Sequence, residues 1–327
     1  MHYYTQLTYV KKQKKAQYAL FYLCTFFVII KHSKRTDCKS IRGKLINFYG
    51  EIEDMDEKAF SKKAVEILRR IKKQKPLIHH ITNFVVMNTT ANATLAIGAS
   101  PIMAQAHEEM ESVSVFSNAL NLNIGTLNPY WVDSMLIAGR AAGKRGIPVV
   151  LDPVGSGATP LRTEAAKKIL AEVPVTVIRA NASEAMSLFS GTEDIKIRGV
   201  DSIETVDAVR DGARRLAGEL KKIIAVTGEV DFITDGKTDI EVHNGHPMFS
   251  VVTGTGCAAT TAISCFCAVE PDYLAATACA LGYYGLAGEE AARVSAGPGS
   301  FQVALFDVLY NLSEETMMER LKIKPVK

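Results

Sequence analysis

The sequence has no regular cysteine ladder, no hydrophobic run long enough to cross a bilayer, and only a small net positive charge of +3. The uneven spacing of its six cysteines argues against a disulfide-rich secreted scaffold and predicts reduced, buried thiols in a cytoplasmic protein. Cys265 and Cys267 lack the second pair of ligands that a zinc site needs. Residues 55–327 carry 28 Lys and Arg against 31 Asp and Glu, so no nucleic-acid partner is indicated.

The first 54 residues differ in composition from the rest of the chain. They carry ten Lys and Arg against four Asp and Glu, and the uncharged run from Ala16 to Ile30 has 15 residues. A membrane-spanning helix needs about 20 residues, and no small-residue cleavage site follows the run. We interpret residues 1–54 as an extension upstream of the true start at Met55, with a short membrane anchor as the alternative. Residues 55–327 are then a single domain.

Short apolar runs alternate with helical patterns after residue 54. Predicted strands cover 77–81, 100–104, 121–124, 149–151, 175–178, 222–226, 232–234 and 239–242. Predicted helices cover 55–75, 83–97, 132–144, 165–170, 206–218 and most of the chain from residue 255. Because parallel strands are joined by right-handed helical crossovers, this order predicts an α/β fold with a mainly parallel sheet and helices on both faces.

A glycine-rich segment stands out in the C-terminal third. Gly254-Thr255-Gly256-Cys257 lies where a strand ending at Val251–Val252 is expected to give way to a helix of small residues. Glycine allows a tight turn there, and the first N–H groups of a helix have no partner within the helix. Such a turn is suited to binding a phosphoryl group, although many similar turns bind nothing.

Two more polar segments follow predicted strands. Asp152 begins one of them, and Arg179-Ala180-Asn181-Ala182-Ser183-Glu184 forms the other. The carboxyl ends of parallel strands form the ligand crevice of open α/β sheets. An arginine there is suited to phosphate, and one or two carboxylates meet the needs of Mg²⁺. The structural alternatives are an ion pair for Arg179, a turn residue before Pro153 for Asp152, and a first-turn helix acid for Glu184.

Several motifs taken together resemble the hydroxyethylthiazole kinase family over about residues 60–320. They are Ile81-Thr82-Asn83-Phe84-Val85-Val86-Met87-Asn88, Gly98-Ala99-Ser100-Pro101-Ile102-Met103, Asp152-Pro153-Val154-Gly155, Asn181-Ala182-Ser183-Glu184, Gly254-Thr255-Gly256-Cys257 and Gly297-Pro298-Gly299-Ser300-Phe301. The resemblance implies a ribokinase-like three-layer fold and Mg²⁺-dependent transfer of the ATP γ-phosphoryl group to 4-methyl-5-(2-hydroxyethyl)thiazole in thiamine salvage. It also implies a cytoplasmic homotrimer with active sites between subunits.

The resemblance also assigns roles to particular residues. It implies that the thiazole alcohol lies against Met103, Gly254 and the segment around Asn83. The implied nucleotide contacts are Arg179 and Thr227, with Asn181 beside them, and the residues that organise Mg²⁺ through water are Asp152 and Glu184. Gly254, Gly256 and Cys257 form the implied catalytic turn. From the residues alone, Met103 offers a polarisable wall to a sulfur heterocycle, and packing in the core is its structural alternative.

Cys257 departs from the wider ribokinase-like pattern, which has an aspartate at this place as the base for the alcohol proton. The helix N-terminus lowers the pKa of a thiol, whereas nearby phosphate raises it. We therefore expect anion binding and alignment to supply most of the rate, with a modest role for Cys257. Three other functions remain open: an ADP-dependent hydrate dehydratase of the same fold, a cysteine hydrolase, and a non-catalytic binder of thiamine precursors.

Overall fold

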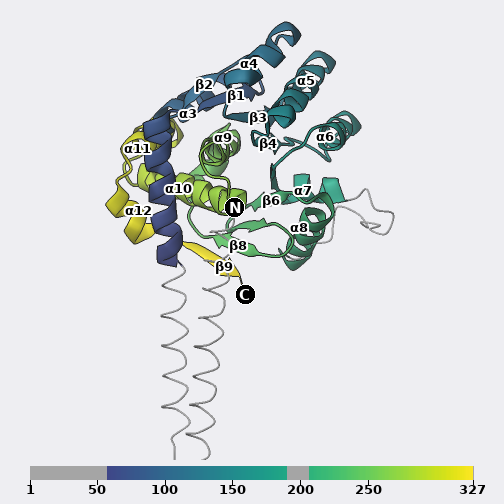
Figure 1. The fold of residues 1–327 in the computed structure, drawn as a ribbon. Helices are drawn as coiled ribbons and strands as arrows, with labels where there is room; N and C mark the ends of the chain where they lie inside the picture. Colours follow the sequence, from purple (N-terminus) through teal and green to yellow (C-terminus); the bar gives the residue numbers. More distant parts are fainter. Residues whose placement is uncertain (1–56, 190–205, 327) are drawn as a thin grey trace, which may run out of the picture. The chain divides into compact units, whose positions relative to one another are not determined.

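The chain divides into two units, residues 1–54 and residues 55–327. The computed structural model describes residues 57–189 and 206–326, which belong to the second unit (Figure 1). The predictions made for residues 1–54, a misassigned start or a short anchor, lie outside these described residues. No helix in the described ranges is both long and apolar enough to cross a membrane.

One nine-stranded sheet, in the order β2-β1-β3-β4-β5-β6-β7-β8-β9, forms the centre of the described domain. The first six strands along the chain pair in parallel, and β7, β8 and β9 add antiparallel pairs at one edge. Their bounds are Leu77–Ile81, Ser100–Ile102, Ala119–Asn123, Val149–Asp152, Val177–Asn181, Ile223–Thr227, Asp231–Thr234, Asp239–Val242 and Ile323–Val326. The last strand was not predicted, because it is short and carries a proline, which sheets tolerate at an edge.

Helices cover both faces of this sheet (Figure 1). One layer contains α4 (Met110–Phe116), α5 (Pro129–Arg145), α6 (Pro160–Glu172), α7 (Ala182–Phe189) and α8 (Val206–Leu220). The other contains the helix of residues 57–74, α3 (Met87–Ile97), α9 (Thr255–Cys267), α10 (Tyr273–Arg293), α11 (Pro298–Asn311) and α12 (Glu314–Arg320). Each layer buries its own apolar core against the sheet. The predicted three-layer α/β architecture is therefore confirmed.

The helix predicted from residue 83 begins four residues later, at Met87. The Asn83 side-chain oxygen accepts a hydrogen bond from the Val85 backbone N–H at 3.1 Å, and the Asn83 carbonyl accepts one from Val86 at 3.2 Å. An asparagine that bonds to its own following backbone favours a turn over a helix. This turn places the Asn83 side chain at the carboxyl end of β1.

The strand expected to end at Val251–Val252 is absent from the structure. Pro247–Val251 instead forms a 3₁₀ helix, η2, and the His246 ring accepts a hydrogen bond from the Met248 N–H at its start. Proline fits the first position of a helical turn, where no hydrogen-bond donor is required. A 3₁₀ helix that packs on α10 therefore precedes the glycine turn. The prediction that a strand precedes this turn was wrong.

Candidate active site

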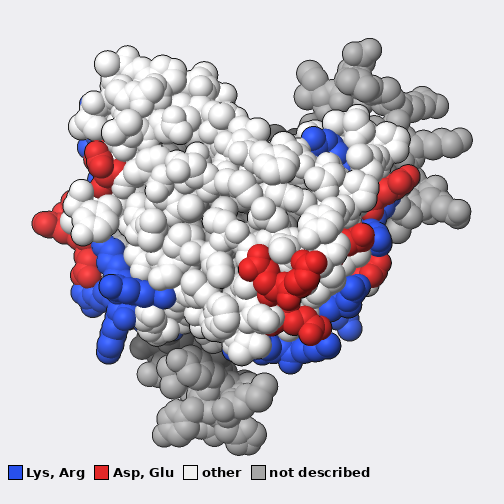
Figure 2. Space-filling model, turned by 90° about the horizontal axis from the view of Figure 1, so that it is seen from above, with Lys and Arg blue, Asp and Glu red and all other residues white. Residues whose placement is uncertain are grey.

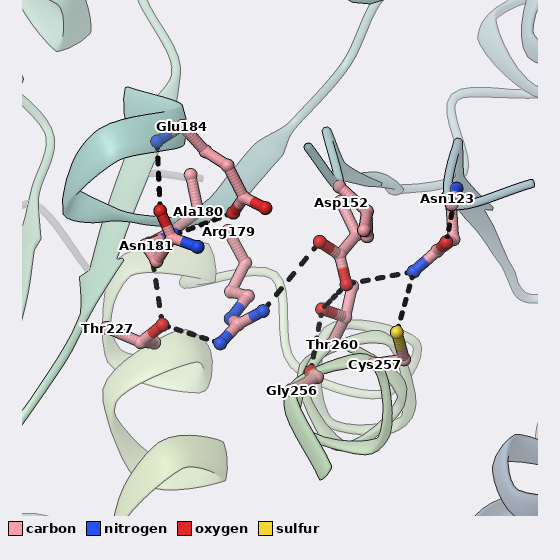
Figure 3. A network of polar contacts seen from close by, with 12 residues as sticks. Asn123, Asp152, Arg179, Ala180, Asn181, Glu184, Thr227, Gly256, Cys257 and Thr260 are labelled. Carbon is pink, nitrogen blue, oxygen red and sulfur yellow. Dashed lines mark hydrogen bonds and ion pairs between the residues drawn. The ribbon is translucent and has the colours of Figure 1, made fainter. Parts of the chain in front are cut away.

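Polar side chains at the carboxyl ends of the neighbouring strands β3, β4, β5 and β6 gather near the N-terminus of α9 (Figure 3). Asn123 of β3 and Asp152 of β4 are register partners, as are Asn181 of β5 and Thr227 of β6. Asn83 follows β1, the neighbour of β3. The parallel register alone brings these positions to one edge of the sheet, and α9 then lies across it.

Asp152 is fully buried at the centre of the cluster. Its Oδ2 accepts hydrogen bonds from the Thr260 hydroxyl at 2.8 Å and from Asn123 Nδ2 at 3.0 Å. Its Oδ1 has no hydrogen-bond partner within the described residues. Burial raises the pKa of this carboxyl to about 6, although Arg179 and the two hydrogen bonds oppose the shift. The ionised carboxylate is therefore incompletely compensated and can take a cation at Oδ1.

Arg179 connects Asp152 to the next strand. Its Nη1 lies 3.7 Å from Asp152 Oδ1, and its Nη2 donates a hydrogen bond of 2.6 Å to the Thr227 hydroxyl (Figure 3). The side chain is only 13% exposed, and its Nε has no partner within the described part of the chain. A planar guanidinium held in this way has N–H groups left for a phosphate. Arg179 thus forms the ion pair that was its structural alternative, and it also keeps N–H groups that a phosphate could use.

The glycine turn needs both of its glycines. Gly254 has a φ of +85°, and a Cβ there would lie 2.7 Å from the Val86 side chain. A Cβ on Gly256 would lie 2.9 Å from Arg179 Nη1. Left-handed backbone is cheap only for glycine, and the missing side chain at Gly256 lets the guanidinium approach the first turn of α9. The predicted anion turn therefore lies next to the predicted phosphate-binding arginine.

Cys257 lies in the first turn of α9 and is a free thiol. Its sulfur accepts hydrogen bonds from Asn123 Nδ2 at 3.2 Å and from Asn83 Nδ2 at 3.6 Å. Burial, together with the charge of Asp152, raises the pKa of the thiol to about 11. A thiol in this environment is protonated at neutral pH. Cys257 is therefore neither a strong base nor the thiolate nucleophile that a cysteine hydrolase needs.

Glu184 is buried and binds two backbone N–H groups. Its carboxylate accepts from Gly155 N at 2.8 Å and from Asn181 N at 2.9 Å, while Asn181 Oδ1 accepts from Glu184 N at 2.9 Å. This reciprocal pattern is a capping box at the start of α7. Glu184 therefore acts as a first-turn acid of α7, which was its structural alternative. Its hydrogen bond to the Gly155 N–H also holds the loop that follows Asp152.

The carboxylates of Asp152 and Glu184 are consistent with the Mg²⁺ site that the family resemblance implies. No three His, Cys, Asp or Glu side chains converge into a full ligand set in the described ranges. Mg²⁺ does not require such a set, since it keeps several waters and uses one or two carboxylates together with substrate phosphates. Asp152 Oδ1 accepts no hydrogen bond within the described residues and is a carboxylate oxygen suited to that purpose, and Glu184 lies close enough to raise the pKa of Asp152.

A cavity of about 1120 Å³ opens beside the cluster on the side of β6. Its lining includes Arg179, Asn181, Thr227, Gly256 and Tyr284. The predicted nucleotide contacts therefore share one cavity with the glycine turn. Met103 lies on the other side of the cluster, half-buried just after the edge strand β2, so it is separated from the nucleotide contacts by several strands.

Asn123 and Thr260 belong to the cluster and were missed from the sequence. Asn123 ends its strand just as Asp152 does, and that parallel could have revealed it. Thr260 follows Cys257 by three positions, so the two side chains share a face of α9. It was missed because a threonine that bonds back to its own helix, as Thr260 does to the Gly256 carbonyl, is common and structural.

The mostly parallel sheet and the three layers place the chain in the ribokinase-like class of α/β folds. A ribokinase-like superfamily protein from Enterococcus faecalis has the same fold, with a TM-score of 0.54 at 13% identity over 73% of this chain and 88% of its own. The hydroxyethylthiazole kinase family model matches residues 68–315. The chain therefore belongs to the hydroxyethylthiazole kinase family, a family of small-molecule kinases.

Individual relatives agree with the family match. A hydroxyethylthiazole kinase of Desulfosudis oleivorans is 68% identical over 272 residues, which are 83% of this chain and 99% of the relative. The solved structure of a hydroxyethylthiazole kinase protein from Pyrococcus horikoshii is 41% identical, with a TM-score of 0.75 over 81% of this chain and 100% of its own. The family named from the sequence motifs is thus confirmed.

Proposed function

We propose that this protein transfers the γ-phosphoryl group of ATP to the hydroxyl of 4-methyl-5-(2-hydroxyethyl)thiazole, a step of thiamine salvage. Membership of the family supports the substrate class. The observation that carries the proposal is the juxtaposition of Arg179, the N-terminus of α9 and the carboxylate of Asp152, with Arg179 and Gly256 lining a large cavity beside them. Phosphoryl transfer depends mainly on positioning and charge stabilisation, which these groups supply.

The nucleotide is proposed to occupy the cavity with its phosphates at the glycine turn. Arg179 would donate to the phosphate oxygens, and Thr227 keeps its guanidinium in place. Asn181 and Thr227 line the same cavity and would contact the nucleotide beyond the phosphates. The N–H groups of the Gly254–Cys257 turn would receive the negative charge that spreads over the transferred group.

The acceptor alcohol is proposed to lie between Asn83, Gly254 and Met103, with its oxygen near Cys257. A bond forms between the alcohol oxygen and the γ-phosphorus while the bond to the β,γ-bridging oxygen breaks. ADP leaves with that electron pair, and the alcohol proton passes to solvent. In a loose transition state the alcohol needs little activation, so a protonated Cys257 is compatible with turnover.

Mg²⁺ would be held by Asp152, and through water by Glu184. When bound, it would neutralise charge on the β- and γ-phosphate oxygens. Asn123 and Thr260 orient the Asp152 carboxylate by binding its other oxygen, which leaves Oδ1 without a hydrogen bond and facing Arg179. Arg179 lowers the cost of burying the carboxylate charge.

A homotrimer with active sites between subunits is proposed for the assembly. Phe84 and Val85 directly follow Asn83, Val251 precedes the glycine turn, and these three side chains are about 60% exposed. Figure 2 shows a broad face on which charged side chains are sparse. Exposed apolar side chains next to a ligand site are typical of surfaces that a partner covers.

We also propose that the protein is cytoplasmic and that residues 1–54 are an extension of a single domain.

The test is ADP release by the full chain with ATP and Mg²⁺. The thiazole alcohol is compared with a blank without alcohol and with hydroxymethylpyrimidine. We expect ADP release that depends on the thiazole alcohol, together with a phosphorylated product of matching mass. A folded protein that releases no ADP with either alcohol would contradict the proposal and favour the dehydratase or binder alternatives.

A further inference from the structure

Two consecutive tyrosines of α10 are buried, and each donates its hydroxyl to a backbone carbonyl. Tyr284 donates to the Thr255 carbonyl at 2.9 Å, and Tyr283 donates to the Leu309 carbonyl. Thr255 is the first residue of α9, whereas Leu309 lies in α11. The two hydroxyls therefore make the same kind of bond, but only the bond of Tyr284 reaches the glycine turn.

The carbonyl that Tyr284 binds belongs to the same peptide unit as the N–H of Gly256. In a trans peptide these two groups point in opposite directions within one plane. A hydrogen bond to the Thr255 oxygen therefore fixes the direction of the Gly256 N–H. It also polarises the unit, because hydrogen bonds along a chain strengthen one another. Gly256 is the residue whose missing side chain leaves room for Arg179.

Further contacts hold Tyr284 and the turn together. The Tyr284 ring stacks on Phe249 with a centroid distance of 5.0 Å and an angle of 12° between the planes. The Thr255 hydroxyl donates to the Phe249 carbonyl at 2.7 Å and to the Val252 carbonyl at 3.1 Å. Gly288 of α10 gives the Phe249 ring its room, since a Cβ there would lie 2.2 Å from that ring. The glycine turn thus contacts α10 in two ways, directly through Tyr284 and indirectly through Phe249 of η2.

We infer that Tyr284 is a positioning residue for phosphoryl transfer, which fixes the Thr255–Gly256 peptide so that the Gly256 N–H meets the transferred phosphoryl group. The inference rests on the proposed function, because it assumes that this turn receives phosphate. Tyr284 does not itself need to touch the reacting atoms. Its effect should therefore appear in kcat and in the binding of phosphate-bearing ligands, while the KM of the alcohol stays close to that of the wild type.

The experiment compares Tyr284→Phe with Tyr283→Phe in the full chain. Each substitution removes one buried hydroxyl that binds a backbone carbonyl, so both should destabilise the fold to a similar extent. Loss of a donor that faces a developing oxyanion costs about 100-fold or more in kcat, so a donor left in place but less well directed should cost about tenfold. We expect that loss in Tyr284→Phe, with the alcohol KM within about twofold, and no change in kcat for Tyr283→Phe.

Thr255→Val and Thr255→Ser form a second pair, which is used if Tyr284→Phe does not fold. Val removes the hydroxyl bonds to η2 and should lower kcat, whereas Ser retains them and should restore it. Equal kcat in Tyr284→Phe and Tyr283→Phe would overturn the inference. If the wild type shows no turnover, the proposed function fails separately, and the affinity for ADP measured by calorimetry still tests Tyr284: weaker binding in Tyr284→Phe alone supports its role, and equal binding overturns it.

Discussion

Two buried polar regions of the same sheet differ in what surrounds them. His79 and His80 of β1 each bind one partner through Nε2, namely the Ala104 carbonyl at 2.9 Å and the Thr94 hydroxyl at 3.0 Å. Burial lowers the pKa of both rings, to about 3 for His80. Asp152 is equally buried, but its cluster adds a cation, a helix N-terminus and a cavity.

This difference shows that a shifted pKa does not by itself identify a site. Burial is the main cause both of the pKa of about 3 for His80 and of the pKa of about 6 for Asp152. The histidine region keeps neutral side chains, each of which has a hydrogen bond at Nε2 and none at Nδ1 within the described residues. The Asp152 region instead keeps an ionised group at neutral pH, and its oxygen without a hydrogen bond, Oδ1, lies 3.7 Å from the charged Arg179 Nη1. A buried charge in a concave site is what distinguishes the candidate active site.

Removing the charge of Arg179 should have a very large effect, comparable to that expected from removing the charge of Asp152. Arg179→Met should lower kcat/KM by about 10³-fold, because it removes both the phosphate donor and the counter-charge of Asp152. Arg145→Met is the matched control, since Arg145 donates to the Ser117 carbonyl at 2.9 Å away from the cluster. Steady-state kinetics of both variants measure the contrast. Similar losses in the two variants would mean that the arginine contributes only to folding.

A methyl group on Gly256 should lower kcat by about 100-fold. The added Cβ would lie 2.9 Å from Arg179 Nη1 and push the guanidinium away from the turn. Gly218→Ala in α8 is the control, because a Cβ there meets nothing within 4 Å. That variant should gain up to about 1 kcal/mol in unfolding free energy and keep its turnover. An active Gly256→Ala enzyme would show that the close approach of Arg179 is dispensable.

The histidine region should affect stability rather than turnover. Because burial lowers the pKa of His80 in the folded state, the unfolded chain binds more protons below its own pKa of 6.5. Stability is therefore full above pH 6.5 and falls as the pH drops, by about 1.4 kcal/mol per pH unit for this group. Urea unfolding at pH 7.5 and 5.5 should show this loss in the wild type and less of it in His80→Gln.

His80→Gln also tests the comparison between the two regions. At pH 7.5 its kcat should equal that of the wild type, since His80 is closed off by Thr94 and lies outside the Asp152 cluster. A large fall in kcat with unchanged stability would place the histidine pair in the active site and contradict the difference between the two regions.

Among the residues of the Asp152 cluster, the smallest effect on turnover is expected from Cys257→Ala. The thiol accepts two weak amide hydrogen bonds and is protonated at neutral pH. Losing contacts worth about 1 kcal/mol corresponds to a fall of about fivefold in kcat. Cys265→Ala, on the same helix and fully buried, is the control for loss of a sulfur atom. A folded Cys257→Ala enzyme with nearly no turnover would assign a chemical role to the thiol.

Much of the fold and part of the site followed from sequence patterns. Periodicity identified eight of the nine strands of the described domain, and parallel pairing then placed Asp152, Arg179 and Thr227 at one edge of the sheet. The Asn83 turn could not be separated from a helix start, because the side-chain hydrogen bond that decides it is local and weak. The segment before Gly254 was misread because apolar valines suit a strand and η2 equally.

The long-range contacts of the site were beyond the sequence. Nothing in the spacing shows that Thr260 binds Asp152, which lies 108 residues earlier, or that Tyr284 reaches Thr255. These contacts depend on how α9 and α10 pack against the sheet, which many side chains decide together. The motif positions were therefore readable from the chain, whereas the side chains that support them required the structure.

The most direct test of the account is to measure turnover and stability together in Asp152→Asn. The folded-state pKa of Asp152 is raised to about 6 from 3.8, so its charge lowers stability as the pH rises through that range. Two pH units correspond to about 3 kcal/mol at most, which the neutral amide should recover at pH 7.5. The account predicts a more stable protein with kcat lowered by at least about 10³-fold. A variant that is less stable yet turns over at the wild-type rate would contradict it.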